Sequence, residues 1–101
     1  DPRYLHAELD TYWVQYGGSS PEAWCRRLAG RLPILHMKDY IITEKNQPTF
    51  AEIGSGNLDW NSIVDAAESS GCQWFCVEQD TCPGDPFDSL AISFQYIKQK
   101  L

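Results

Sequence analysis

Five polar side chains follow or interrupt short apolar runs at three places in this 101-residue sequence. Asp10 ends LHAELD, His36 and Lys38 lie in ILHMKD, and Glu78 and Asp80 lie in WFCVEQD. An imidazole with carboxylates forms a mixed nitrogen and oxygen donor set that manganese, magnesium, cobalt and zinc accept. A divalent ion with an open coordination position can polarise a substrate oxygen. The residue types therefore predict a metal site built from Asp10, His36 and Glu78, provided that the three runs lie side by side.

Three apolar segments are predicted strands that would bring these residues together. They span 5–11, 32–37 and 73–78, and segments with a helical pattern follow each of them. Strands that alternate with helices imply parallel pairing with right-handed crossovers. The fold class expected is α/β, with three consecutive βα units and parallel strands. In such folds ligands collect at the carboxyl ends of the strands, where the polar residues lie.

Capping residues mark the starts of the three predicted helices. Ser20 precedes Pro21, Asp59 precedes an apolar pattern, and Asp85 precedes Pro86. Ser and Asp are favoured N-caps, and proline is favoured at the first helical position. The connection 38–57 contains Pro48, Gly54 and Gly56, which break regular structure, and it is expected to be a long loop of the kind that is usually functional.

Alternation along each strand groups the polar residues in pairs. Residues two apart share a face, so Glu8 lies with Asp10, His36 with Lys38, and Glu78 with Asp80. The pattern alone leaves another interpretation open. His36 could be a hydrogen-bonded core histidine, and the carboxylates could cap neighbouring helices.

Composition excludes several kinds of partner. The net charge is −6 with only eight basic residues, so the chain lacks the clustered Lys and Arg of a nucleic-acid surface. No apolar run approaches the roughly 20 residues that span a bilayer. We expect a cytoplasmic protein that binds neither nucleic acid nor membrane. The four cysteines are expected to be reduced thiols.

Four stretches together resemble a known family. ELDTYWVQYGG, GRLPILHMKD, AEIGSGNLDW and CVEQDTCPGDP are similar, in this order and spacing, to the last three βα units of the sugar phosphate isomerase/epimerase group of xylose-isomerase-like TIM barrels. The resemblance covers essentially the whole chain. It implies that residues 1–101 form one partial barrel domain, the C-terminal part of a (β/α)8 TIM barrel.

The resemblance also implies a metal centre and a reaction. Family members bind one divalent ion, often manganese, through Glu, Asp, His and Glu at the ends of the last four strands. Asp10, His36 and Glu78 match the second, third and fourth ligands, and the first Glu would precede Asp1. Magnesium, cobalt or zinc are alternatives to manganese. Glu78 would be the catalytic acid/base residue that moves a proton on a metal-bound sugar or sugar phosphate.

Two departures limit what the resemblance implies about substrate contacts. Related epimerases carry His three residues after the Asp ligand and Arg six residues after the His ligand, where this chain has Trp13 and Ile42. Trp13 could instead stack on a sugar face or simply pack. Lys38 could bind a phosphate or carboxylate group or stabilise an enolate, or it could be a solvated lysine paired with Asp39 or Asp80.

Length leads to a prediction about partners. A complete eight-fold barrel takes roughly 250 residues, and three units leave open strand edges and apolar faces. We therefore expect this chain to associate with the missing N-terminal barrel portion, or with itself. The leading function is part of a metal-dependent sugar isomerase or epimerase, which could be inactive by itself. The alternative is a non-catalytic sugar-binding remnant or subunit of such an enzyme.

Overall fold

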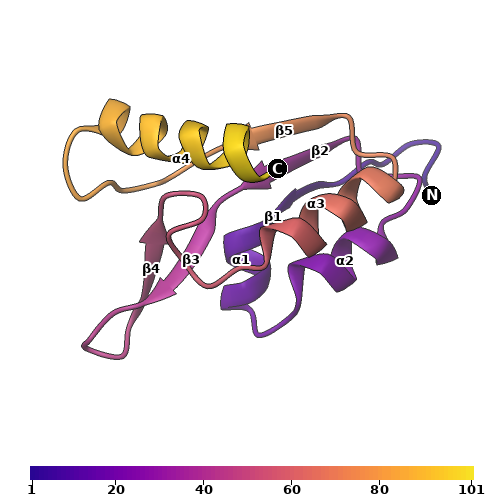
Figure 1. Ribbon diagram of the computed structural model, residues 1–101. Coiled ribbons are helices and arrows are strands. Elements are labelled where there is room, and N and C mark those ends of the chain that lie inside the picture. The colour runs from indigo at the N-terminus through magenta and orange to yellow at the C-terminus, as the bar shows by residue number, and fades with distance from the viewer.

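The computed structural model describes residues 1–101 and contains a three-stranded parallel sheet. The elements in chain order are β1 (Glu8–Asp10), α1 (Thr11–Tyr16), α2 (Pro21–Arg27), β2 (Ile34–Met37), β3 (Asp39–Ile42), β4 (Pro48–Ala51), α3 (Trp60–Ser69), β5 (Trp74–Val77) and α4 (Pro86–Lys100). The sheet order is β1-β2-β5, with Asp10 beside His36 and His36 beside Cys76 (Figure 1). The predicted α/β fold with parallel strands is confirmed.

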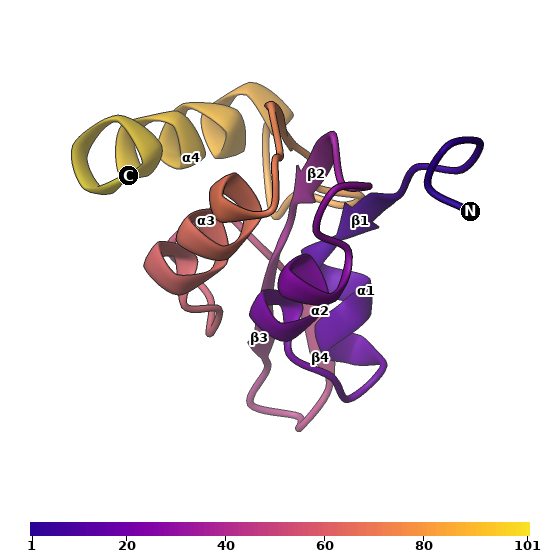
Figure 2. The ribbon, with the colours of Figure 1, turned by 90° about the vertical axis from the view of Figure 1, so that its right-hand side faces the viewer.

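The core lies between β2 and the helices α2 and α3. Figure 2 shows these two helices next to each other on one side of the strands. Leu35 and Met37 of β2 point into this core, and His36 between them has the opposite direction and is only partly buried. The buried apolar cluster is Cys25, Leu32, Leu35, Met37, Ile53, Trp60, Ile63, Ala66, Ala67 and Cys72. The apolar alternation of β2 thus leaves its polar residues on the other face of the sheet.

The strands are shorter than predicted, and a short helix that was not predicted, α1, follows the first strand. The first strand covers only Glu8–Asp10, and the chain turns directly into α1 at Thr11. The side chain of Asp10 accepts a hydrogen bond from the Trp13 N–H, which makes it the N-cap of α1. This cap was allowed for in the alternative interpretation of the polar residues, although no helix was predicted to begin at Thr11.

The connection expected to be a loop contains an antiparallel hairpin, so that prediction was wrong. β3 and β4 pair with Asp39 opposite Ala51 and Ile42 opposite Pro48. Asn46 adopts a left-handed conformation in the turn, with φ of 57°. Figure 1 shows the hairpin extending beyond the carboxyl end of the parallel strands. The hairpin therefore adds residues to the edge where the polar side chains collect.

A single buried carboxylate holds the hairpin to the segment that follows it. Asp39 is fully buried, and its two oxygens accept five hydrogen bonds. The donors are the backbone N–H groups of Tyr40, Gly54, Gly56 and Leu58 and the indole N–H of Trp60. The carboxylate thus organises the whole connection from β3 to α3, and it faces away from Lys38.

The predicted helix starts are confirmed. Ser20, Asp59 and Asp85 are the N-caps of α2, α3 and α4, and Pro21 and Pro86 are the first residues of α2 and α4.

All four cysteines are free thiols. None of the helices has both the length and the apolar character that crossing a bilayer requires.

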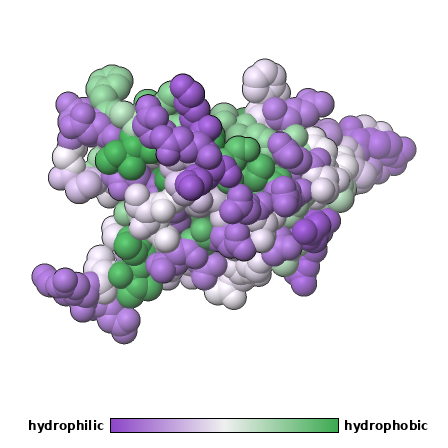
Figure 3. Space-filling view, in the orientation of Figure 1, coloured by the Kyte–Doolittle hydropathy of each residue, from purple (hydrophilic) through white to green (hydrophobic).

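Helix α4 leaves its apolar stripe uncovered. Its buried residues are Ser89 and Ser93, and the Ser93 hydroxyl accepts the Ile53 N–H at 3.0 Å. Phe87 and Phe94 are 79% and 57% exposed, and they line an apolar groove together with Val77, Leu90, Ala91 and Ile97. Figure 3 shows apolar surface over this part of the molecule. The predicted open edges and uncovered apolar faces are therefore present.

Candidate metal centre

The three predicted ligands meet at the carboxyl edge of the sheet. One ligand atom from each of Asp10, His36 and Glu78 lies within 4.8 Å of the other two. His36 Nδ1 is 2.9 Å from Glu78 Oε2 and 4.0 Å from Asp10 Oδ2. Parallel pairing explains the convergence, because Asp10 is in register with His36 and the Glu78 N–H bonds to the Met37 carbonyl. The structure brings the three residues together, and their role as metal ligands stays a prediction.

The carboxylate of Glu8 orients the imidazole of His36. His36 Nε2 lies 2.6 Å from Glu8 Oε1, which directs Nδ1 towards Asp10 and Glu78. Histidines that bind metals commonly donate their other ring N–H to a carboxylate, which fixes the ring and its tautomer. Glu8 was not among the predicted site residues, although its spacing of two from Asp10 placed it on the same face.

Asp10 serves the fold and the site at once. Its Oδ1 accepts the Trp13 N–H at 3.1 Å, and its Oδ2 faces Lys38 and His36. The interpretation of the carboxylates as helix caps is therefore correct for Asp10. Capping uses one oxygen and leaves the other available to the site.

Lys38 lies at the centre of the carboxylates. Its side chain is 2% exposed, and Nζ is 2.7 Å from Asp80, 3.0 Å from Asp10 and 3.1 Å from Glu78. The expectation of a solvated lysine was wrong, although the pairing with Asp80 is present. The hydroxyl of Thr11 holds the backbone of Lys38 in place: it accepts the Lys38 N–H at 2.9 Å and lies 2.8 Å from its carbonyl.

The charge of Lys38 is secured by its partners. Burial disfavours the ammonium form, but hydrogen bonds to Asp80, Asp10 and Glu78 outweigh it, and the pKa of Lys38 is raised above its ordinary value. The three carboxylates therefore favour the ammonium form of Lys38, whose N–H groups are directed at them.

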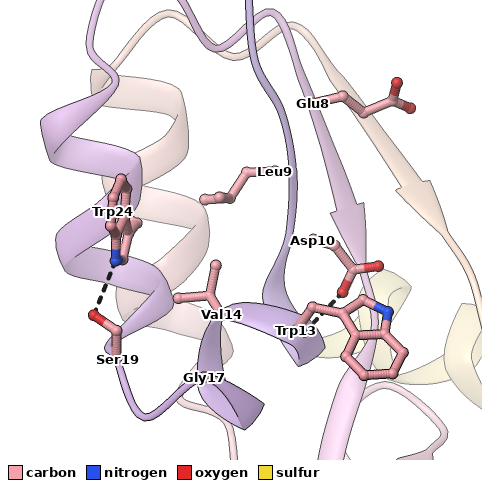
Figure 4. Close-up of a pocket in the computed structure, with 8 residues that line it drawn as sticks. All are labelled: Glu8, Leu9, Asp10, Trp13, Val14, Gly17, Ser19 and Trp24. Atoms are coloured by element: carbon pink, nitrogen blue, oxygen red, sulfur yellow. Dashed lines mark hydrogen bonds between the residues drawn. The ribbon is translucent and has the colours of Figure 1, made fainter.

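Aromatic side chains form a wall next to the charged cluster. The centroid of the Tyr12 ring lies 4.3 Å from that of Phe50 and 4.9 Å from that of Trp13. Lys38 Nζ lies 5.6 Å from the centroid of the Phe50 ring. Glu8, Asp10 and Trp13 line a cavity of about 420 Å³. Figure 4 shows Trp13 beside Asp10 at this cavity. Phe50 belongs to the hairpin, so no sequence signal placed it here. Trp13 packs edge-on against Tyr12, and its side chain is 48% exposed.

The donor set fits a divalent ion. It combines one imidazole nitrogen with two carboxylates, and such mixed sets suit manganese, cobalt and zinc. His36 Nδ1 lies 2.9 Å from Glu78 Oε2 and 4.0 Å from Asp10 Oδ2, and all three ligand atoms lie within 4.8 Å of one another, close enough to share one ion. Asp80 could hold Lys38 beside the ion, because Asp80 lies outside the donor triad.

Comparison with solved structures identifies similar folds. One crystal structure from Parabacteroides distasonis matches with a TM-score of 0.76 and 22% identity, covering 98% of this chain and 33% of that one. A second structure from the same organism gives a TM-score of 0.77 and 26% identity, covering 99% of this chain and 32% of that one. Both are sugar phosphate isomerase/epimerases. The resemblance predicted from the sequence is confirmed.

The matches cover nearly all of this chain but only part of each solved structure. The chain spans about a third of the length of the structures it matches. This share agrees with the expectation that the chain corresponds to part of a larger barrel. No protein-family model matches the chain, and a search of curated proteins finds no relative.

Proposed function

We propose that this chain forms part of a divalent-metal-dependent sugar or sugar phosphate isomerase or epimerase. The observation that carries the proposal is the convergence of Asp10, His36 and Glu78 from three neighbouring parallel strands. The three residues would hold one ion, with manganese expected first. The bound ion would supply Lewis acidity to a substrate carbonyl.

The protein side chains would divide the remaining work among them. Glu78 is 44% exposed, so a substrate can reach its carboxylate, and it would take a proton from the carbon next to the carbonyl. In an isomerisation the same carboxyl group would return the proton to the former carbonyl carbon, while the hydroxyl proton moves from one substrate oxygen to the other. In an epimerisation a second acid on the opposite face, outside these three βα units, would return a proton to the same carbon. Lys38 would hold the carboxylates of Asp10, Glu78 and Asp80 in place and offset part of their negative charge. Trp13 would stack on the sugar.

The rest of a barrel would complete the site. The outer edges of β1 and β5 are unpaired, and the groove along α4 is apolar. We propose that these three βα units correspond to the C-terminal part of a (β/α)8 barrel, and that further strands or a second copy cover both edges. The cytoplasmic location predicted from the sequence stays a prediction.

Metal titration with matched histidine variants tests the proposal. We expect the chain to bind one equivalent of Mn²⁺, measured by electron paramagnetic resonance of the free ion. His36→Ala should lose this binding. His6→Ala should keep it, because His6 is the only other histidine and lies outside the donor triad. Equal binding by both variants, or none by the unaltered chain, would contradict the metal site.

A non-catalytic sugar-binding protein is the second candidate. The ammonium group of Lys38 already neutralises carboxylates that a metal would share, so the cluster could be stable without an ion. Metal content decides between the two candidates. Sugar binding with no bound Mn²⁺ would favour the second.

A further inference from the structure

Lys38 has no free hydrogen-bond donor for a substrate anion. An ammonium group carries three N–H donors. Nζ of Lys38 lies within hydrogen-bond distance of Asp80, Asp10 and Glu78, at 2.7, 3.0 and 3.1 Å. All three donors are directed at the protein's own carboxylates. The one lysine at this edge is therefore used internally.

His36 is enclosed in the same way. Nε2 faces Glu8 at 2.6 Å, and Nδ1 faces Glu78 at 2.9 Å. The other seven of the eight basic residues lie on helices, at the amino side of the strands or in the hairpin turn: Arg3, Arg26, Arg27, Arg31, Lys45, Lys98 and Lys100. Lys38 is the only lysine or arginine paired with Asp10, Glu78 or Asp80, and Lys45 lies further out, in the turn of the hairpin.

The helix N-termini at this edge are occupied as well. In α/β barrels, phosphate groups frequently bind at helix N-termini and in the loops after the last strands. Here the first turns of α1, α3 and α4 are capped by Asp10, Asp59 and Asp85, whose carboxylates accept backbone N–H groups at 3.1, 3.2 and 2.8 Å. Asp88 adds a further negative charge to the first turn of α4. Three of the four helix N-termini are thus capped by a carboxylate, and the fourth, that of α2, is capped by Ser20 and has Glu22 in its first turn.

Four carboxylates surround the site, namely Glu8, Asp10, Glu78 and Asp80. A histidine that binds a metal ion is neutral. Lys38 and one divalent ion then offset three of the four negative charges, so the site stays negative with the ion bound. Phosphate would be repelled, whereas sugar hydroxyl groups can donate hydrogen bonds to carboxylates. The exposed face of Trp13 offers a surface for the C–H face of a sugar ring.

We infer that the site takes an uncharged sugar or polyol and discriminates against its phosphate ester. This inference rests on the proposed function, because it concerns the substrate of the same metal site. It deepens that proposal by choosing between the two substrate classes it allows.

Matched pairs of free and phosphorylated ketoses test the inference. The Mn²⁺-loaded chain is titrated by calorimetry, at low ionic strength, with D-fructose, D-tagatose and the 6-phosphate of each. We expect at least one free ketose to bind at least tenfold more tightly than its ester. An ester that binds as tightly as its free ketose, or no response to either free ketose, would overturn the inference. Absence of stoichiometric Mn²⁺ binding instead overturns the proposed function itself.

A charge variant shows whether the carboxylates cause the preference. Asp80→Asn removes one negative charge beside Lys38 and keeps the side-chain shape. The ratio of the affinity for the free ketose to the affinity for its ester should fall about fivefold in this variant, because one charge at a partly solvated site has a Coulomb effect of about this size. Asp65→Asn on the exposed side of α3 should leave the preference unchanged. Equal preferences in both variants would contradict the electrostatic explanation.

Discussion

The carboxylate of Asp39 offers the sharpest test of how the connection between β3 and α3 is held. Its Oδ2 accepts three N–H groups, from Gly54, Gly56 and Trp60, and its Oδ1 accepts two, from Tyr40 and Leu58. Asn has the same shape but replaces one oxygen by an amide group that can only donate. Whichever way the amide is turned, it faces at least two N–H donors that lose their acceptor.

The expected loss follows from this count. A buried donor left without a partner costs about 1–3 kcal/mol, so Asp39→Asn should lower the free energy of unfolding by about 4 kcal/mol. For a domain of this size, that corresponds to a fall in Tm of roughly 15–30 °C. Urea unfolding followed by circular dichroism measures the difference. Asp65→Asn is the matched control, because Asp65 is exposed and should change stability by less than about 0.5 kcal/mol. A loss below about 1 kcal/mol in Asp39→Asn, or the same loss in the control, would refute the reasoning.

Two further predictions concern the contacts of the segment after β4 with α4. Gly54→Ala should be more destabilising than Gly71→Ala, because both residues have positive φ but only a Cβ at Gly54 would meet the Tyr96 ring, at 2.2 Å; equal losses in thermal unfolding would contradict the close approach. Ser89→Ala should reduce stability at pH 7 by about 1.5 kcal/mol, because the Ser89 hydroxyl donates to Glu52 at 2.7 Å. This bond, which outweighs burial, lowers the pKa of Glu52 below its ordinary 4.5, so its stabilisation is present above pH 4.5 and is lost as the pH falls through the pKa of the folded state. Unfolding at pH 7 and pH 3 should show the gap between variant and unaltered chain closing, and a constant gap would contradict the assignment.

Local signals explain which elements could be predicted from the sequence. The helices that begin after Ser20, Asp59 and Asp85 were predicted because an N-cap acts on N–H groups only two or three residues away. The meeting of Asp10, His36 and Glu78 was predictable too, because parallel pairing brings the carboxyl ends of the strands to one edge.

Long-range contacts explain what the sequence did not reveal. The hairpin is fixed by Asp39, whose donors lie up to 21 residues further along the chain. Lys38 is buried against three carboxylates from two distant segments, Asp10 at the end of β1 and Glu78 and Asp80 after β5, so its neighbours in the sequence gave no sign of its burial. Phe50 reaches the site only through the hairpin. These features depend on tertiary structure, which residue spacing does not encode.

The position of the bound ion tests the central claim most directly. A crystal of the chain grown with Mn²⁺ and measured at the manganese absorption edge would locate the metal by its anomalous signal. We predict one peak bonded to Asp10 Oδ2, His36 Nδ1 and Glu78 Oε2, with Lys38 still paired to Asp80. A map with no peak among these three atoms, and with Lys38 as the only cation between the carboxylates, would contradict the metal centre.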